Sequence, residues 1–264
     1  MQNKDASYVA SLRTFNKMGY KVNSGEKGLK ILIPNFYNIV KIKQEDGSYQ
    51  YKPQFALNEE ELEKYKNKDD DSITFHNQKL SNFRVGSVFD VSQTNMPIDE
   101  INKTLNPVLE DERAPEITDN FIKAIYKSDF KIEYVDNIEN GAKGYCDFDN
   151  NKIVVKKGMG NLMRLKVVIH EYAHSLAHKH LKDNKMDYVE HRNKYETEAE
   201  SIAYVVSKYL GLDVSDYSNM YLYSWSKEKD FKEIDDSLNT IVNYSKMIIN
   251  NYEHILEKEK NIEI

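Results

Sequence analysis

The sequence predicts an α+β protein in which a small mixed N-terminal domain with a β-sheet precedes a mainly helical domain with a short β-sheet. All 5 prolines lie at or before Pro115, so no proline interrupts a helix in the second half of the chain. Before that point apolar residues form compact runs rich in β-branched and aromatic types, whereas after it they recur at helical spacing. The 264 residues, 40% of them hydrophobic, suit a soluble protein of one large or two modest domains.

The N-terminal part is predicted to consist of strands and loops, with one short helix near its start. GLKILIP (28–34) and FRVGSVFDV (83–91) are compact apolar runs typical of strands. Between them, NEEELEKYKNKDDDS (58–72) is charged and poor in core formers, which favours a solvated loop, a frayed helix or a disordered segment. The segment 95–116 is typical of a linker with one short helix. We therefore place a domain boundary near residue 110, between domains 1–110 and 111–264.

The second domain is predicted to open with a helix at 116–129. Three short strands follow, KIEYV (131–135), GYCDF (144–148) and KIVVKK (152–157). The Asp-Asn-Asn of DFDNNK (147–152) supplies the turn chemistry that joins the last two strands into a hairpin.

Three helical stretches complete the chain, at 161–181, 194–210 and about 228–258. In the last of these, apolar residues recur at helical spacing: Ile234, Leu238, Ile241, Ile248, Tyr252 and Ile255. We expect this stripe to face the core, and a surface for a partner helix is the alternative.

The segment VVIHEYAHSLAH (167–178) holds three of the 7 histidines of the chain. Its His170, Glu171 and His174 fit the pattern H-E-x-x-H, in which both imidazoles lie on one helix face and can reach a single ion. Glu171 projects about 100° around the helix from His170, so it is poorly placed as a ligand but well placed to polarise a metal-bound water. The alternative is a helix that carries histidines by chance.

A catalytic zinc needs a third protein ligand and one open position. The downstream helix offers Glu196, Glu198 and Glu200, of which Glu196 and Glu200 share a face because they are four residues apart. We expect Glu196 to be the ligand and Glu200 to accept the free N–H of a ligand histidine. Glu198 is expected to point elsewhere, and an ordinary acidic solvent face is the alternative for all three.

The other polar residues near the motif are less clear from the sequence. His178 continues the row of histidines, but three consecutive turns rarely surround one ion, so we expect it at the rim of the cleft or exposed. His191 or Tyr188 could reach the site as a proton donor, although a surface position is favoured for both.

This set of residues predicts metal-assisted hydrolysis with Zn²⁺ as the cofactor. Glu171 would take a proton from the water that zinc activates and deliver it to the leaving amine. The hairpin GYCDFDNNKIVV (144–155) would offer an edge strand with which an extended peptide substrate could pair.

Several segments together resemble those of one known family. HEYAHSLAH (170–178) with YETEAESIAYVV (195–206) resembles the zincin-like domain of ArdC-type antirestriction proteins and, more distantly, of ImmA/IrrE metallopeptidases. The segments 6–34 and 83–94 are similar to the ArdC-like N-terminal domain, and 141–159 is similar to proteins of conjugative and other mobile elements.

The resemblance implies roles for several residues. It implies metal ligands at His170, His174 and Glu196, a base at Glu171, and an N-terminal domain that binds single-stranded DNA. Because family members carry a further helical segment before the matching region, we expect the N-terminal domain to be truncated at its start.

The residues themselves give some support for DNA binding. A local cluster of basic residues could contact phosphates, although scattered basic residues usually only solvate a surface: Arg13, Lys17, Lys21, Lys27 and Lys30. Tyr8, Phe15 and Tyr20 lie between them in the sequence and could stack on bases. The net charge of −6 means that any such surface must be a local patch.

Composition also limits where the protein is expected to act and which partners it is expected to have. The chain shows no apolar run long enough to cross a membrane and no signal peptide, and its one cysteine, Cys146, cannot form an internal disulfide. We therefore expect a cytoplasmic protein with no membrane partner. Two functions stay open: a zinc-dependent peptidase with a DNA-binding domain, or an accessory protein whose zincin domain is structural or a docking surface. The sequence sets no oligomeric state.

Overall fold

The computed structural model describes residues 9–67, 69–97, 100, 110–212 and 231–260, and it confirms the predicted α+β class. Residues 32–86 form one compact unit, and the described residues on either side of them form another. The predicted linker at 95–116 lies largely outside the described residues. The domain boundary near residue 110 therefore stays a prediction.

A four-stranded sheet with the order β1-β4-β2-β3 runs through the N-terminal half. Its strands are β1 (Val9–Ala10), β2 (Leu29–Lys43), β3 (Tyr49–Pro53) and β4 (Ile73–Asp90). The predicted strands at 28–34 and 83–91 are confirmed as parts of β2 and β4, which are much longer. In the added length of β4 (73–82) most residues are polar and many are exposed, whereas that of β2 includes the buried Ile39, Val40 and Ile42.

The charged stretch 58–72 contains a capped helix, α2 (Glu59–Lys66), rather than a loop or a frayed segment. The Asn58 side chain accepts a hydrogen bond from the Glu61 backbone, and the Glu61 side chain accepts one from the Asn58 backbone, which satisfies two end groups of the helix. Tyr65 packs against the buried cluster of Val40, Ile42 and Ile73. One apolar contact and a capping box thus fix a helix whose composition suggested disorder.

The expected short helix near the start of the chain is confirmed as α1 (Leu12–Lys17). Ser11 caps it by accepting a hydrogen bond from the Thr14 backbone at 3.1 Å. Its Phe15 is completely buried in a cluster with Ala10, Val91 and Met96.

The second sheet has three strands, as predicted: β5 (Lys131–Val135), β6 (Gly144–Asp147) and β7 (Lys152–Lys156). Their order is β5-β7-β6, with β5 parallel and β6 antiparallel to β7. Asn151 adopts a left-handed conformation (φ 50°) in the tight turn of the predicted hairpin, a conformation that asparagine tolerates better than most residues. Strand β6 therefore lies at the edge of this sheet.

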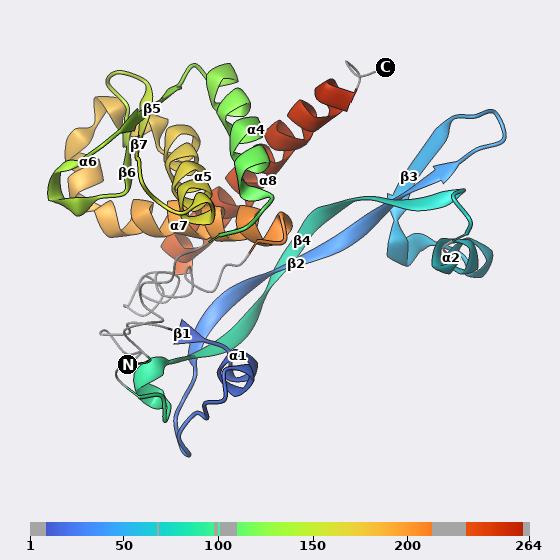
Figure 1. Cartoon of the computed structure of the whole chain (residues 1–264), viewed down its shortest axis with the longest axis horizontal. Helices are drawn as coiled ribbons and strands as arrows, with labels where there is room; N and C mark the ends of the chain where they lie inside the picture. The colour runs from blue at the N-terminus through green and yellow to red at the C-terminus, as the bar shows by residue number, and fades with distance from the viewer. Residues whose placement is uncertain (1–8, 68, 98–99, 101–109, 213–230, 261–264) are drawn as a thin grey trace. The chain divides into compact units, whose positions relative to one another are not determined.

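Helices pack around this sheet and against one another (Figure 1). They are α4 (Ala114–Lys127), α5 (Asn161–Ala177), α6 (Lys185–Glu190), α7 (Arg192–Tyr209) and α8 (Phe231–Lys260). The predicted helices are confirmed, except that the 161–181 stretch ends as α-helix at Ala177 and the short α6 was not expected. In the described part of the chain, no helix combines the length and apolar character needed to cross a bilayer.

An aromatic cluster holds α4, α5 and α8 together. The Phe121 ring stacks on Tyr252 with centroids 4.9 Å apart and meets Tyr172 edge-on at 6.3 Å. The Tyr172 hydroxyl accepts a hydrogen bond from Asn251 at 3.0 Å, so its polar end is satisfied. In the predicted stripe of α8, Ile241, Ile248, Tyr252 and Ile255 are buried and Leu238 is partly buried, so this part of the stripe faces the core as predicted. The side chain of Ile234 lies outside the described residues.

This cluster yields a stability prediction. We expect Phe121→Ala to lower the free energy of unfolding by about 3–5 kcal/mol, because it leaves a cavity between two tyrosine rings. Urea denaturation followed by circular dichroism measures the change. Tyr126→Ala, on the exposed side of the same helix, is the matched control and should stay within about 0.5 kcal/mol of the parent. Equal losses in the two variants would contradict the assigned core.

Candidate metal centre

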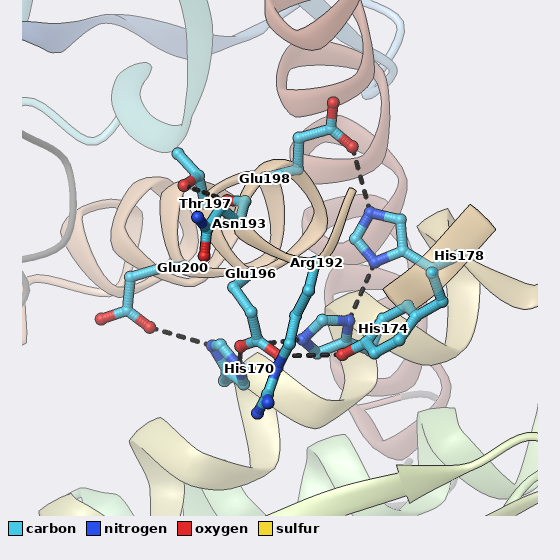
Figure 2. A network of polar contacts seen from close by, with 10 residues as sticks. His170, His174, His178, Arg192, Asn193, Glu196, Thr197, Glu198 and Glu200 are labelled. Atoms are coloured by element: carbon cyan, nitrogen blue, oxygen red, sulfur yellow. Dashed lines mark hydrogen bonds and ion pairs between the residues drawn. The ribbon is translucent and has the colours of Figure 1, made fainter. Parts of the chain in front are cut away.

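Helices α5 and α7 pack against each other and bring three donor side chains to one point. His170, His174 and Glu196 each offer a ligand atom, and these atoms all lie within 4.8 Å of one another. Glu196 Oε2 is 3.5 Å from His170 Nε2 and 3.6 Å from His174 Nε2. Figure 2 shows both imidazoles turned toward the Glu196 carboxylate.

These spacings suit a zinc ion. Two ligand atoms about 2.1 Å from a tetrahedral ion lie roughly 3.4 Å apart, close to both measured nitrogen–oxygen separations. Burial lowers the pKa of His174 to about 4, so this imidazole is neutral at pH 7 and offers a lone pair. Burial acts to raise the pKa of Glu196, but the neighbouring His170 and His174 outweigh it and hold the pKa far below its usual range. Burial acts to lower the pKa of His170, but the Glu196 and Glu200 carboxylates outweigh it and hold this pKa well above its usual range. His174 therefore offers a neutral nitrogen and Glu196 an anionic oxygen, whereas His170 must lose a proton to bind an ion.

Both helices carry small side chains in the protein interior. Ala173 on α5 and Ala199 and Ala203 on α7 are all completely buried. Large residues at such positions would hold the helix axes further apart and separate the donors.

Two further side chains hold the donors in position. Glu200 Oε2 lies 2.9 Å from His170 Nδ1, the ring nitrogen on the opposite edge from Glu196. The Tyr188 hydroxyl donates a hydrogen bond to Glu196 Oε1 at 2.8 Å, which leaves Oε2 facing the histidines. The favoured surface position of Tyr188 is thus wrong, because α6 turns this side chain inward and its sequence neighbours gave no sign of that helix.

Glu171 lies beside the donors and is almost fully buried. Burial raises its pKa to about 7, with the nearby Glu196 and Glu200 carboxylates adding to the rise and His170 opposing it. A carboxyl group with a pKa near neutrality can both accept and release a proton at physiological pH.

A cleft of about 670 Å³ opens onto these residues. One wall is formed by strand β6 and the turn that follows it, including Tyr145, Cys146 and Phe148. Gly144 permits this wall to lie close to α5, because a Cβ at this position would come within 2.6 Å of Val167 Cγ1 and 3.2 Å of Glu171 Cγ. The predicted edge strand therefore lines the same cleft as the histidines and the glutamate.

The expected rim or exposed position of His178 is wrong. Helix α5 ends at Ala177, and His178 departs from helical geometry (φ −116°, ψ 10°), which turns its side chain inward. It is completely buried, with Nδ1 at 2.9 Å from His174 Nδ1 and Nε2 at 3.1 Å from Glu198 Oε2. Glu198 points away from the other two glutamates, as expected, but its pairing with His178 was not foreseen.

The remaining histidines lie at the surface. His180 is exposed. His191 is largely exposed and lies 3.0 Å from Asp187, in agreement with the favoured surface position.

In the N-terminal half, all members of the predicted basic cluster are exposed: Arg13, Lys17, Lys21, Lys27 and Lys30. The predicted stacking partners differ. Phe15 is completely buried and Tyr20 packs on the same cluster, so Phe15 cannot stack on a base. Tyr8 lies outside the described residues. Sequence proximity to lysines could not reveal that Phe15 faces inward from α1.

Comparisons with known proteins give distant similarities. No protein-family model matches the chain. It is 26% identical over 275 aligned residues to the uncharacterized protein pXO2-81 of Bacillus anthracis, an alignment covering 96% of this chain and 45% of that protein. The chain thus spans about half the length of this relative. A metal-free crystal structure of the antirestriction protein ArdC from plasmid R388 aligns with a TM-score of 0.41 and 17% identity, covering 96% of this chain and 80% of that one.

The geometry predicts zinc binding that depends on the three donors. We expect the purified protein to bind one zinc ion. His174→Ala should weaken zinc binding more than the loss of a residue behind a ligand, which typically costs about 10–100-fold, because it removes a ligand itself. Competition with a chromophoric chelator measures the affinity. His180→Ala is the matched control, since it removes an exposed histidine nearby and should bind as the parent does. A parent protein without measurable zinc affinity would contradict the assignment.

Proposed function

We propose that this protein is a zinc-dependent metallopeptidase in which His170, His174 and Glu196 hold the metal. The observation that carries this proposal is the convergence of these three donor atoms within 4.8 Å, beside a buried Glu171 and at an open cleft. Three protein ligands leave a fourth position, which distinguishes catalytic zinc sites from the four-ligand structural ones. A purely structural site would also have no use for a buried carboxyl group next to the donors.

A bound zinc ion would supply Lewis acidity, which acidifies water and polarises a carbonyl group. Glu171 then has the role of a proton carrier. One of its carboxylate oxygens accepts a proton from the attacking water, and the same oxygen delivers that proton to the nitrogen of the leaving amine. Tyr188 and Glu200 keep Glu196 and His170 in place during this transfer through their contacts at 2.8 and 2.9 Å.

The proposed substrate is an extended segment of polypeptide. Strand β6 pairs only with β7 in its sheet, so its outer edge can form main-chain hydrogen bonds with an added strand. That edge lines the same cleft as Glu171 and the three donors. A peptide paired with β6 would therefore pass the site in an extended conformation.

We propose in addition that the N-terminal half binds single-stranded DNA, and that residues 32–86 supply an aromatic surface for it. In the β2–β3 register Lys41 is opposite Tyr51 and Lys43 is opposite Tyr49, so all four side chains lie on one face. The Tyr51 ring lies 4.6 Å from that of His76, and Lys41 Nζ lies 3.7 Å above the Tyr49 ring.

This face has the chemistry that single strands require. Tyr49 and Tyr51 remain about half exposed, at 47% and 52%. Exposed rings offer stacking to any base, and neighbouring lysines attract phosphates. The exposed basic cluster from Arg13 to Lys30 belongs to the other compact unit and would offer separate contacts to phosphates. Together with the resemblance to antirestriction proteins, this suggests a cytoplasmic role in a mobile genetic element.

The alternative is a non-catalytic accessory protein whose zincin-like domain serves as a docking surface. It would require the DNA-binding surface but not the proton-carrying function of Glu171. A biological effect that survives Glu171→Gln would favour this alternative.

The catalytic proposal predicts the effect of one oxygen-to-nitrogen change. We expect Glu171→Gln to lower kcat/KM by about 10²–10⁴-fold, because an amide cannot accept the proton from water. Cleavage of a quenched-fluorescence peptide library by the zinc-loaded protein measures the rate. Glu190→Gln, an exposed glutamate on α6, is the control and should retain full activity. Wild-type turnover by Glu171→Gln would exclude the proposed mechanism.

The DNA-binding proposal predicts a face-dependent loss of affinity. We expect Tyr51→Ala to weaken binding of a fluorescent oligothymidine by about 1–3 kcal/mol, because it removes one stacking ring. Phe75→Ala is the matched control. Phe75 is similarly exposed (53%) but adjacent to His76 on β4, and successive side chains of a strand point to opposite faces. Fluorescence anisotropy over a range of salt concentrations measures both variants. Equal losses, or affinity that does not fall as salt rises, would argue against this surface.

A further inference from the structure

A buried chain of polar contacts leads away from the metal donors. His174 Nδ1 lies 2.9 Å from His178 Nδ1, and His178 Nε2 lies 3.1 Å from Glu198 Oε2 (Figure 2). The Ser237 hydroxyl of α8 donates to the second oxygen of Glu198 at 2.6 Å. His174, His178 and Glu198 are 4%, 0% and 3% exposed, so bulk water does not compete for these contacts.

The order of these contacts fixes where each proton sits. A carboxylate only accepts hydrogen bonds, so His178 must carry its proton on Nε2 and donate it to Glu198. A neutral His178 then presents a bare Nδ1, which can only accept. His174 must therefore carry its proton on Nδ1, and its lone pair is left on Nε2, the nitrogen 3.6 Å from Glu196 Oε2.

We propose that His178 and Glu198 form a positioning pair that holds His174 in the tautomer able to bind the metal. This inference rests on the proposed function and deepens it. Neither residue contacts the cleft or the reacting atoms. They act through His174 by setting which of its nitrogens is bare and how its ring is oriented.

The two ligand histidines are supported differently by the same helix. His170 meets its carboxylate directly, at 2.9 Å from Glu200. His174 meets its carboxylate through one intervening imidazole. Glu198 and Glu200 are two positions apart on α7 and so face different directions, which lets one helix serve both histidines. The His178 imidazole bridges the gap between His174 and Glu198.

Burial of Glu198 is difficult to explain without such a task. Removing a carboxylate from water carries a large desolvation cost, which a few hydrogen bonds only partly offset. Lys194 Nζ is 4.0 Å away, at the limit of an ion pair. An apolar pair at positions 178 and 198 would fill the space without this desolvation cost, but it would leave His174 Nδ1 without a partner in the protein interior.

The first experiment compares zinc affinity in variants at position 178. We expect His178→Leu to weaken zinc binding by about 10–100-fold, measured by chelator competition, because neither tautomer of His174 is then preferred. His178→Gln retains one acceptor and one donor and should recover most of this loss. Urea denaturation of the metal-free proteins runs in parallel. A folded His178→Leu protein with the parent's zinc affinity would overturn the proposal, even if its stability were lower.

The second experiment uses the parent protein without metal, so it does not depend on the folding of any variant. Long-range ¹H–¹⁵N spectra of the metal-free parent at neutral pH report which imidazole nitrogen carries the proton. We expect a protonated Nδ1 on His174 and a protonated Nε2 on His178. The opposite tautomer on His174 would refute the proposal. Because this readout does not depend on zinc, failure of the parent to bind zinc would remove the proposed peptidase without deciding the tautomer.

Discussion

The close packing of α5 against α7 is the constraint on which the rest of this site depends. The H-E-x-x-H pattern places two imidazoles on one face of a single helix, but two ligands do not define a zinc site. The third proposed ligand is Glu196 on α7, whose Oε2 lies 3.5–3.6 Å from Nε2 of both histidines. Buried alanines on both helices are compatible with such a close approach.

Several polar and charged side chains are buried around the same interface. Glu171, Glu198, His174 and His178 are all less than a tenth exposed. Such groups are stable in a protein interior only when each finds a partner. For His174, His178 and Glu198 the partners come from one another and from Ser237 of α8, which completes the chain that starts at His174. The packing of α5, α7 and α8 therefore positions these polar groups as well as the core.

Much of this arrangement could be predicted from the sequence, because it is encoded in local spacing. The i, i+4 pairs His170/His174 and Glu196/Glu200 follow from helix periodicity alone. The strands around the hairpin follow from apolar runs and turn residues. His178 could not be placed in this way, since its position depends on α5 ending at Ala177 rather than at the predicted residue 181. Phe15 was misjudged for a similar reason: the sequence gives the ring but not the side of α1 that faces the core.

Gly144 is the residue that allows the proposed peptide-binding strand β6 to lie close to the proposed proton carrier Glu171. Strand β6 could not lie against α5 with a side chain here, because a Cβ would be 2.6 Å from Val167 and 3.2 Å from Glu171. The absence of that atom lets the edge strand lie directly over the carboxyl group. A peptide paired with β6, as proposed above, would pass Glu171 through backbone hydrogen bonds, which do not depend on the side chains of the peptide. Selectivity for particular sequences would then come from the other cleft residues, including Phe148 and Val189.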